Sequence, residues 1–254
     1  MAWQDLRDAV HAGEYEVYVN ISRDGGITWL GDQRLTHVEL NYTGATKADV
    51  AVEGKNIYVT WVDARKGGAP ETWINISHDN GKTWTGEFNL SKIDGNWSNW
   101  PHIAVDKNTV VVVWGDDRDH PEEGRSVYMR VSQDNGTTWG PEIRVTNITD
   151  IDWRYDDIPT QVLVNGTNVY LVFDRFFNDT GYAETMFMKS SDLGQTWTTP
   201  VLLSRHDGWN SYSGGLAIYD TWVFLLCGKI VQQKTRSIFG GARTWVILGF
   251  RSRG

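Results

Sequence analysis

Acidic and basic side chains recur together as a short Asp-x-Arg motif along this 254-residue chain. The motif occurs at Asp5/Arg7, Asp63/Arg65 and Asp116/Arg118, and in a shortened form at Asp174-Arg175. An arginine fork can bind a carboxylate through two parallel hydrogen bonds. Candidates for holding an acidic ligand are therefore Arg65, Asp116, Arg118 and Arg175. The favoured alternative is structural, because a pair repeated in every unit is expected to tie one unit to the next.

Aromatic residues form a second set of candidates, in three segments that align with one another. These segments are 97–101, 155–159 and 209–213, and each begins with Trp or Tyr. Aromatic faces beside amides and carboxylates suit a sugar, which needs apolar stacking and directional hydrogen bonds. The candidate contacts are Trp153, Arg154, Tyr155, Asp156 and Trp209, with Asp157 next to them. The alternative is that these rings pack beneath the loops as structural caps.

Metal chemistry is not predicted. The acidic segments 116–119 and 150–152 carry oxygen ligands of the kind that Ca²⁺ accepts, but such loops are more often simply solvated. The six histidines are scattered, and the single Cys227 excludes both a disulfide framework and a cysteine zinc site. We therefore expect no metal and no cofactor.

The elements that must position these residues follow from a phrase that occurs four times, Ser-x-Asp-x-Gly-x-Thr-Trp. A short Asp can bond the backbone ahead of it, Gly allows positive φ, and Thr-Trp resumes a packed strand, so the phrase predicts a tight turn. Its starts are 55, 55 and 58 residues apart, which indicates one repeated unit. The structural residues expected in each copy are Asp24 and Trp29, Asp79 and Trp84, Asp134 and Trp139, and Asp192 and Trp197.

Each unit is predicted to be a small antiparallel sheet. In the second unit, strands are expected at 47–53, 56–63, 71–77 and 83–91, because these runs are rich in Val, Ile, Thr and aromatics and are separated by Gly, Asn and Asp. Four antiparallel strands make a propeller blade. No segment has a sustained helical period, so no helix is expected.

The repeated phrase is similar to the Asp-box, or BNR repeat, of the sialidase-like β-propellers. The resemblance implies an all-β, single-domain propeller of four-stranded antiparallel blades, with four clear repeats and a degraded fifth. It gives a blade remnant at 1–40, blades at about 41–92, 93–147 and 148–205, and an eroded blade at 206–254 whose altered box is 237–245. The family has six blades, so we expect an incomplete ring, with self-association if the ring is open.

The same resemblance constrains function less than fold, since the boxes lie on the face away from the ligand site. Sialidases use a Tyr nucleophile. The resemblance also implies a Glu that activates this Tyr, an Asp that acts as acid/base, and three Arg that bind the substrate carboxylate. One of these Arg belongs to an Arg-Ile-Pro motif. Here the nearest match is Asp157-Ile158-Pro159, and no Arg-Ile-Pro occurs. The first hypothesis is a non-catalytic module that binds a glycan or a protein. The alternative is an exo-sialidase or related glycoside hydrolase, and the third is a structural repeat or incomplete gene product without activity.

Charge and composition limit the partners. A formal charge of −8 and a pI near 5.2 disfavour nucleic acid and anionic membranes, and no apolar run is long enough to span a membrane. Among the partners considered, a carbohydrate or a glycoprotein is still compatible with this charge and composition. Nine Asn-x-Ser/Thr sequons favour an extracellular or cell-surface protein, although the chain opens without a signal peptide. The sequons are equally well explained by turns rich in Asn, Ser and Thr.

Overall fold

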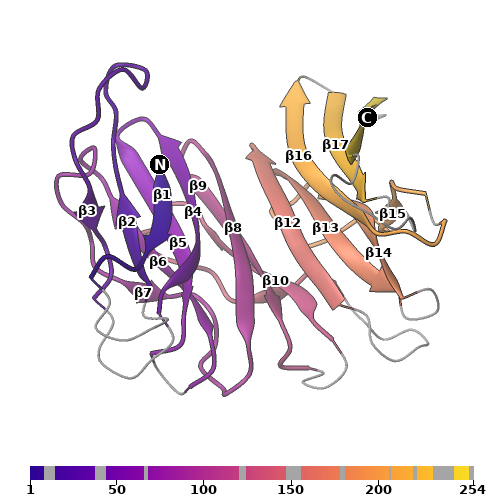
Figure 1. Cartoon of the computed structure of the whole chain (residues 1–254), viewed down its shortest axis with the longest axis horizontal. Helices are drawn as coiled ribbons and strands as arrows, with labels where there is room; N and C mark the ends of the chain where they lie inside the picture. Colours follow the sequence, from indigo (N-terminus) through magenta and orange to yellow (C-terminus); the bar gives the residue numbers. More distant parts are fainter. Residues whose placement is uncertain are drawn as a thin grey trace, which may run out of the picture.

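The protein folds into β-sheets that stand side by side, from β1–β3 at one end to β16–β18 at the other (Figure 1). The computed structural model describes residues 1–8, 15–37, 44–65, 68–119, 124–146, 156–177, 181–205, 207–219, 222–230 and 243–251. These residues form five antiparallel sheets and no helix. None of this described part could therefore cross a membrane as a helix.

Three of the sheets have four strands in chain order. The second sheet is β4 (Thr46–Glu53), β5 (Asn56–Asp63), β6 (Glu71–Ser77) and β7 (Phe88–Asn89). The third is β8 (Ser98–Asp106), β9 (Thr109–Asp116), β10 (Ser126–Ser132) and β11 (Ile143–Arg144). The fourth is β12 (Asp156–Asn165), β13 (Asn168–Phe177), β14 (Tyr182–Ser190) and β15 (Val201–Leu202).

The first and fifth sheets have three strands each. The first contains β1 (Ala2–Asp5), β2 (Glu16–Val19) and β3 (Gln33–Arg34), and the fifth contains β16 (Ser211–Tyr219), β17 (Trp222–Ile230) and β18 (Arg243–Arg251). The all-β prediction and the four-stranded unit are thus confirmed. The strands β4, β8, β12 and β16 contact one another in turn, which makes them the inner strands of the array.

Two predictions about strands were wrong. The fourth strand of the second unit was expected at 83–91 but comprises only Phe88–Asn89, because Thr83 is held by Asp79 within the turn. The altered box at 237–245 was expected between the third and fourth strands of its sheet. Residues 237–242 lie outside the described part, but Thr244 and Trp245 already belong to β18, the third strand, which pairs directly with β17. The apolar run that follows them favours a strand over a turn.

The apolar core lies between the sheets. Alternate residues of β9 face opposite neighbours, so that Val110 and Val112 pack towards the second sheet while Val111 and Val113 pack towards the fourth. All four are fully buried. A strand covered on both faces reads as a continuous apolar run, which explains the four consecutive valines.

The four Asp-boxes share one hydrogen-bond geometry. In the second box, Thr83 donates from its N–H to Asp79 Oδ1 at 2.9 Å and from its hydroxyl to Asp79 Oδ2 at 2.7 Å, while the Gly81 N–H donates to Ser77 Oγ at 2.8 Å. The same bonds recur around Asp24, Asp134 and Asp192, and the Thr donors lower the pKa of each of these three carboxyls to about 2. Each box is therefore a self-contained turn.

Boxes also fasten neighbouring sheets together. Trp84 packs between the first and second sheets and donates to Gln33 Oε1 at 3.3 Å, and Trp139 and Trp197 pack in the next two apolar clusters. The box glycine Gly136 has φ +83°, and a Cβ there would collide with Ile76 Cδ1 of the preceding sheet. Glycine is thus required for its backbone angle, and any larger residue would also force the terminal methyl of the buried Ile76 to move.

Replacing Gly136 by alanine is expected to destabilise the protein by about 2–4 kcal/mol, since overpacking adds to backbone strain. Gly26, in the first box, provides a matched control: its φ is +91°, but no atom lies within 4 Å of an added Cβ. Gly26→Ala should cost only about 1 kcal/mol. Urea unfolding of both variants measures the difference, and equal losses would contradict the proposed role of close inter-sheet packing.

Candidate ligand-binding site

The ends of the inner strands opposite the boxes carry a repeated irregularity. A shift in strand pairing occurs at Thr46/Asp49 in β4, Asn99/His102 in β8, Pro159/Gln161 in β12 and Ser213/Gly215 in β16. Such bulges bend a strand and redirect side chains. Within the first two, Lys47 and Trp100 both adopt the left-handed backbone region, with φ of +54°. The bulges therefore bring side chains of successive sheets together at one end of the array.

A cluster around Trp100 results. The Lys47 ammonium lies 3.7 Å from the centroid of the Trp100 ring, and the Arg125 guanidinium carbon lies 4.6 Å from it. Lys47 Nζ also donates to Asn99 Oδ1 at 2.8 Å, and Arg125 Nη1 donates to both carboxylate oxygens of Asp156, at 3.0 and 2.8 Å. Three sheets thus contribute, with Lys47 from the second, Trp100 and Arg125 from the third and Asp156 from the fourth.

The cluster has an excess of positive charge. Burial against the ring, with the nearby charge of Arg125, lowers the pKa of Lys47 to about 8. Asp156 neutralises Arg125, whereas no carboxylate of the described residues forms an ion pair with Lys47. The buried Arg125 Nε also lacks a hydrogen-bond partner within that part of the chain. The cluster thus places two cations beside the ring in a protein of net charge −8, with Asp156 paired to Arg125 and the Asp117 carboxyl also close enough to interact with Arg125.

The Asp-x-Arg pairs form clamps inside single sheets. Arg118 donates to Asp116 from Nε at 2.8 Å and to Glu142, just before β11, from Nη1 at 2.6 Å. Arg65 holds Asp63 and Glu87 in the same way, and Arg7 holds Asp5 and Asp32. Each guanidinium lies over an aromatic ring of its own sheet, respectively Tyr128, Trp73 and Tyr18. The pairs thus act mainly within their own sheets. The expected tie between blades is present at Arg118, whose Nε lies 3.9 Å from Asp94 Oδ2 in the segment that joins the second and third sheets.

Comparison with known proteins places the chain in a family. Residues 7–213 match the model of the BNR repeat-like domain. The chain belongs to the BNR repeat-like family. No curated protein matches it in sequence.

Solved structures similar to this BNR repeat-like chain include two sialidases. The Hadza microbial sialidase Hz136 is 13% identical, with a TM-score of 0.57 over 94% of this chain and 53% of its own. Trypanosoma rangeli sialidase in complex with the inhibitor DANA is 14% identical, with a TM-score of 0.55 over 91% of this chain and 40% of its own.

A third similar structure is the GH43 endo-arabinanase from Bacillus licheniformis, which is 9% identical, with a TM-score of 0.52 over 94% of this chain and 90% of its own. At these identities the comparisons establish a sialidase-like propeller fold alone. The BNR repeat-like chain spans about half the length of the Hz136 sialidase and less than half that of the trypanosomal one.

The shortened pair Asp174-Arg175 departs from the clamps of this BNR repeat-like domain. In the third sheet, Asp116 pairs with Ser126, the first residue of the third strand's buried part. The equivalent residue of the fourth sheet is Glu184, and it pairs with Arg175 and not with Asp174. Arg175 binds Asp157 in two parallel bonds of 2.7 Å. Because side chains alternate between faces, Asp174 points the other way and accepts bonds from Thr185 and Ser213. Alignment of Asp174 with the clamp aspartates was therefore wrong.

Asp157 stands where the family resemblance implies the arginine of Arg-Ile-Pro. Its side chain is fully buried and paired with Arg175, so this position of the BNR repeat-like chain presents no cation to a substrate carboxylate. Asp174 is also buried, and desolvation raises its pKa to about 7. A carboxylic acid that is protonated near neutral pH can donate a proton.

The sequence-predicted aromatic contacts are only partly placed. Trp153, Arg154 and Tyr155 lie outside the described residues, while Asp156 belongs to the Trp100 cluster. Trp209, in the segment before β16, is 36% exposed, and the aligned Trp97 is 49% exposed. These two rings lie on loops that enter inner strands at the same end of the sheets as Trp100.

Sequence reasoning did not select Lys47 or Arg125. Lys47 aligns with Trp100, but its segment lacks the proline that follows Trp100, so the shared bulge is hidden. Arg125 ends the loop between β9 and β10, and this loop differs in length from the equivalent loops of the other sheets, so the repeat does not align it. Aligning the start of β4 with the start of β8 would have placed Lys47 at the position of Trp100 and identified it as a candidate.

The acidic loop at 116–119 is engaged in protein contacts. Asp116 binds Arg118, Asp117 accepts the Trp97 N–H at 2.6 Å, and Asp119 accepts the Tyr128 hydroxyl at 2.5 Å. Among the described residues, no group of three or more His, Cys, Asp or Glu side chains could hold a metal ion. Residues 150–152 lie outside that part.

Proposed function

We propose that this chain is a non-catalytic binding module that takes a carbohydrate, free or on a glycoprotein, at the end of its sheets opposite the Asp-boxes. The Trp100 cluster is the observation that carries the proposal. It joins an aromatic ring, a lysine without a carboxylate partner and an amide within one surface built by three sheets. The ring and the amide hold the Lys47 ammonium in place, and the ammonium supplies charge and directional hydrogen bonds for a sugar that bears a negative charge.

Two features support binding without hydrolysis. The clamp arginines Arg65 and Arg118 already hold two carboxylates each, so gripping a substrate would require those ion pairs to break. The Arg-Ile-Pro position has the buried Asp157. Binding at Lys47 and Trp100 needs neither change. Trp209 and Trp97 are further exposed rings at the same end of the sheets.

Replacing Trp100 by alanine is expected to weaken binding of sialyllactose at least tenfold, because Lys47 and Arg125 both lose the ring that positions them. Isothermal titration at pH 7 measures the loss, with lactose as the uncharged comparison. Trp29→Ala is the matched control, since Trp29 is an exposed tryptophan in a box at the other end of the sheets. Unchanged binding by Trp100→Ala, or no binding of any sugar on a glycan panel, would reject the proposal.

An exo-sialidase or related glycoside hydrolase is the alternative. The near-neutral pKa of Asp174 favours it, since a general acid must hold its proton at working pH. Release of a fluorescent aglycone from a sialoside by the purified chain tests this alternative. Activity that disappears in both Arg118→Ala and Arg175→Ala, with folding retained, would replace the binding proposal by this one.

A further inference from the structure

A pocket of about 520 Å³ opens between the second and third sheets, beside the third Asp-box. Arg130 of β10 lines it together with four apolar residues, which are Ile74 and Ile76 of β6, Phe88 of β7 and Trp139 of the box. Ile74 and Ile76 are buried, whereas Phe88 is 47% exposed. Both flanking sheets carry all four of their strands, so the pocket belongs to a complete interface within the array.

Arg130 uses only one side of its guanidinium within the protein. Nη1 donates to the Leu90 carbonyl at 3.2 Å, whereas neither the buried Nε nor Nη2 has a hydrogen-bond partner among the described residues. Nε and Nη2 form one edge of the guanidinium, and this edge matches the two oxygens of a carboxylate. Arg175 shows the arrangement in the same protein, since it binds Asp157 from Nε and Nη2 at 2.7 Å each. The pocket therefore presents an arginine edge that suits a carboxylate.

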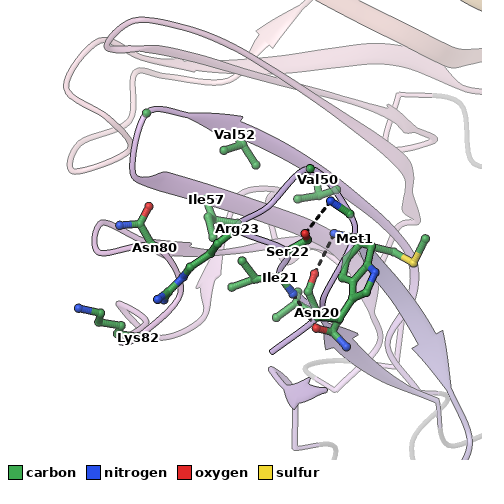
Figure 2. A pocket seen from close by; sticks show the side chains of 15 residues that line it. Met1, Asn20, Ile21, Ser22, Arg23, Val50, Val52, Ile57, Asn80 and Lys82 are labelled. Atoms are coloured by element: carbon green, nitrogen blue, oxygen red, sulfur yellow. Dashed lines mark hydrogen bonds between the residues drawn. The ribbon is translucent and has the colours of Figure 1, made fainter. Parts of the chain in front are cut away.

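The equivalent position carries no charge in the other sheets that have an Asp-box. Arg130 stands two residues before the serine of its box, where the first, second and fourth sheets have Asn20, Asn75 and Met188. Each asparagine accepts the next backbone N–H on its own Oδ1, at 2.8 and 2.9 Å, and Asn20 lies beside Ile21 in Figure 2. Met188 is buried in the apolar cluster between the third and fourth sheets. The cation is therefore particular to the interface between the second and third sheets.

The Trp139 indole offers a second donor at this pocket. In the preceding box, Trp84 donates its indole N–H to Gln33 Oε1 of the neighbouring sheet at 3.3 Å. Phe88 holds the place of Gln33, because each pairs with the residue three positions before the serine of its own box. Phe88 has no acceptor to offer, and no other acceptor in the described part of the chain receives the Trp139 N–H. The pocket thus combines apolar walls with two kinds of unsatisfied donor.

The other polar side chains that line the pocket are engaged within the protein. They are the hydroxyls of Thr85, Thr137 and Thr138, the ring of His78 and the carboxylate of Glu87. Glu87 is paired with Arg65. Arg130 therefore supplies the charge that has no ion-pair partner among the described lining residues, and a ligand there is expected to be an anion.

We propose that this pocket binds a small organic acid whose carboxylate is attached to a flat apolar group. The carboxylate accepts hydrogen bonds from Nε and Nη2 of Arg130, and the apolar group lies against Phe88 and Trp139. A volume of about 520 Å³ is within the range of small-molecule sites. The pocket lies beside a box, whereas the Trp100 cluster lies at the opposite end of the sheets, so the inference is independent of sugar binding.

The test uses phenylacetate as the probe, with phenylacetamide as its uncharged counterpart and acetate as the acid without the ring. Binding of each to the whole chain is followed by NMR titration at pH 7. We expect saturable binding of phenylacetate at millimolar concentration, with shifts at residues 74–76, 85–88, 130 and 136–139. Phenylacetamide and acetate should each bind at least tenfold more weakly, because one lacks the charge for Arg130 and the other lacks the apolar group.

Arg130→Met separates the carboxylate contact from folding, since Met188 shows that methionine is accepted at this position. The variant should bind phenylacetate at least tenfold more weakly and should no longer prefer it over phenylacetamide. Phe88→Gln restores the arrangement of Gln33 and should weaken binding about threefold, because the Trp139 N–H then has an acceptor within the protein. Arg23→Met, which removes an exposed cation of the first box, should leave binding unchanged. No saturable binding of phenylacetate, equal binding by Arg130→Met, or an unaltered preference over phenylacetamide in that variant would each overturn the proposal.

Discussion

Replacing Arg118 by alanine is expected to lower the free energy of unfolding by about 3–5 kcal/mol, because it leaves a buried carboxylate without its cation. Asp116 is 1% exposed and lies 2.5 Å from Arg118 Nη2. Burial opposes the charged form of Asp116, yet the bonds and charge of Arg118 hold its pKa below the ordinary value. Losing Arg118 therefore exposes the full cost of burying Asp116, and guanidinium unfolding at pH 7 measures it.

Arg7→Ala is the matched control for this clamp. Arg7 binds Asp5 and Asp32 with the same geometry, but its side chain is 43% exposed. Solvent screens such a pair, so the expected loss is much smaller than that of Arg118→Ala. A similarly small loss in Arg118→Ala would contradict the clamp and would return Arg118 to the set of residues available to a ligand.

Replacing Asp174 by asparagine is expected to stabilise the protein by about 2–4 kcal/mol above pH 7. Desolvation raises the pKa of Asp174 from 3.8 to about 7. The folded state therefore binds one proton more than the unfolded chain between about pH 4 and 7, and stability falls as pH rises through this window. Asparagine cannot ionise, so this pH dependence is lost. It keeps an Oδ1 that can accept the hydrogen bonds from the Thr185 hydroxyl at 3.1 Å and from the Ser213 N–H at 3.3 Å.

Thermal unfolding of wild type and Asp174→Asn from pH 4 to 8 tests this expectation. The two curves should meet near pH 4 and separate steadily up to pH 7. A smaller slope remains in the variant, because desolvation also raises the pKa of Glu71 to about 7. Parallel curves over the whole range would mean that Asp174 does not hold its proton in the folded protein.

The sequence by itself determined the repeated sheet, because the chemistry that specifies it is local. Asp79 bonds Thr83 four residues away, so the turn can be recognised in the phrase without knowledge of anything distant. The strands Asn56–Asp63 and Glu71–Ser77 were likewise predicted with their observed bounds, since a buried run bounded by turn residues has few alternatives.

Only the tertiary structure decided the candidate sites. Lys47, Trp100 and Arg125 come from two sheets and meet because bulges redirect two inner strands, and a bulge is a property of the pairing between strands. The role of Asp174 depended on register, because a shift of one residue placed Arg175 opposite Glu184 and turned Asp174 to the other face. Such contacts depend on how distant strands align, and residue spacing within one repeat does not encode that alignment.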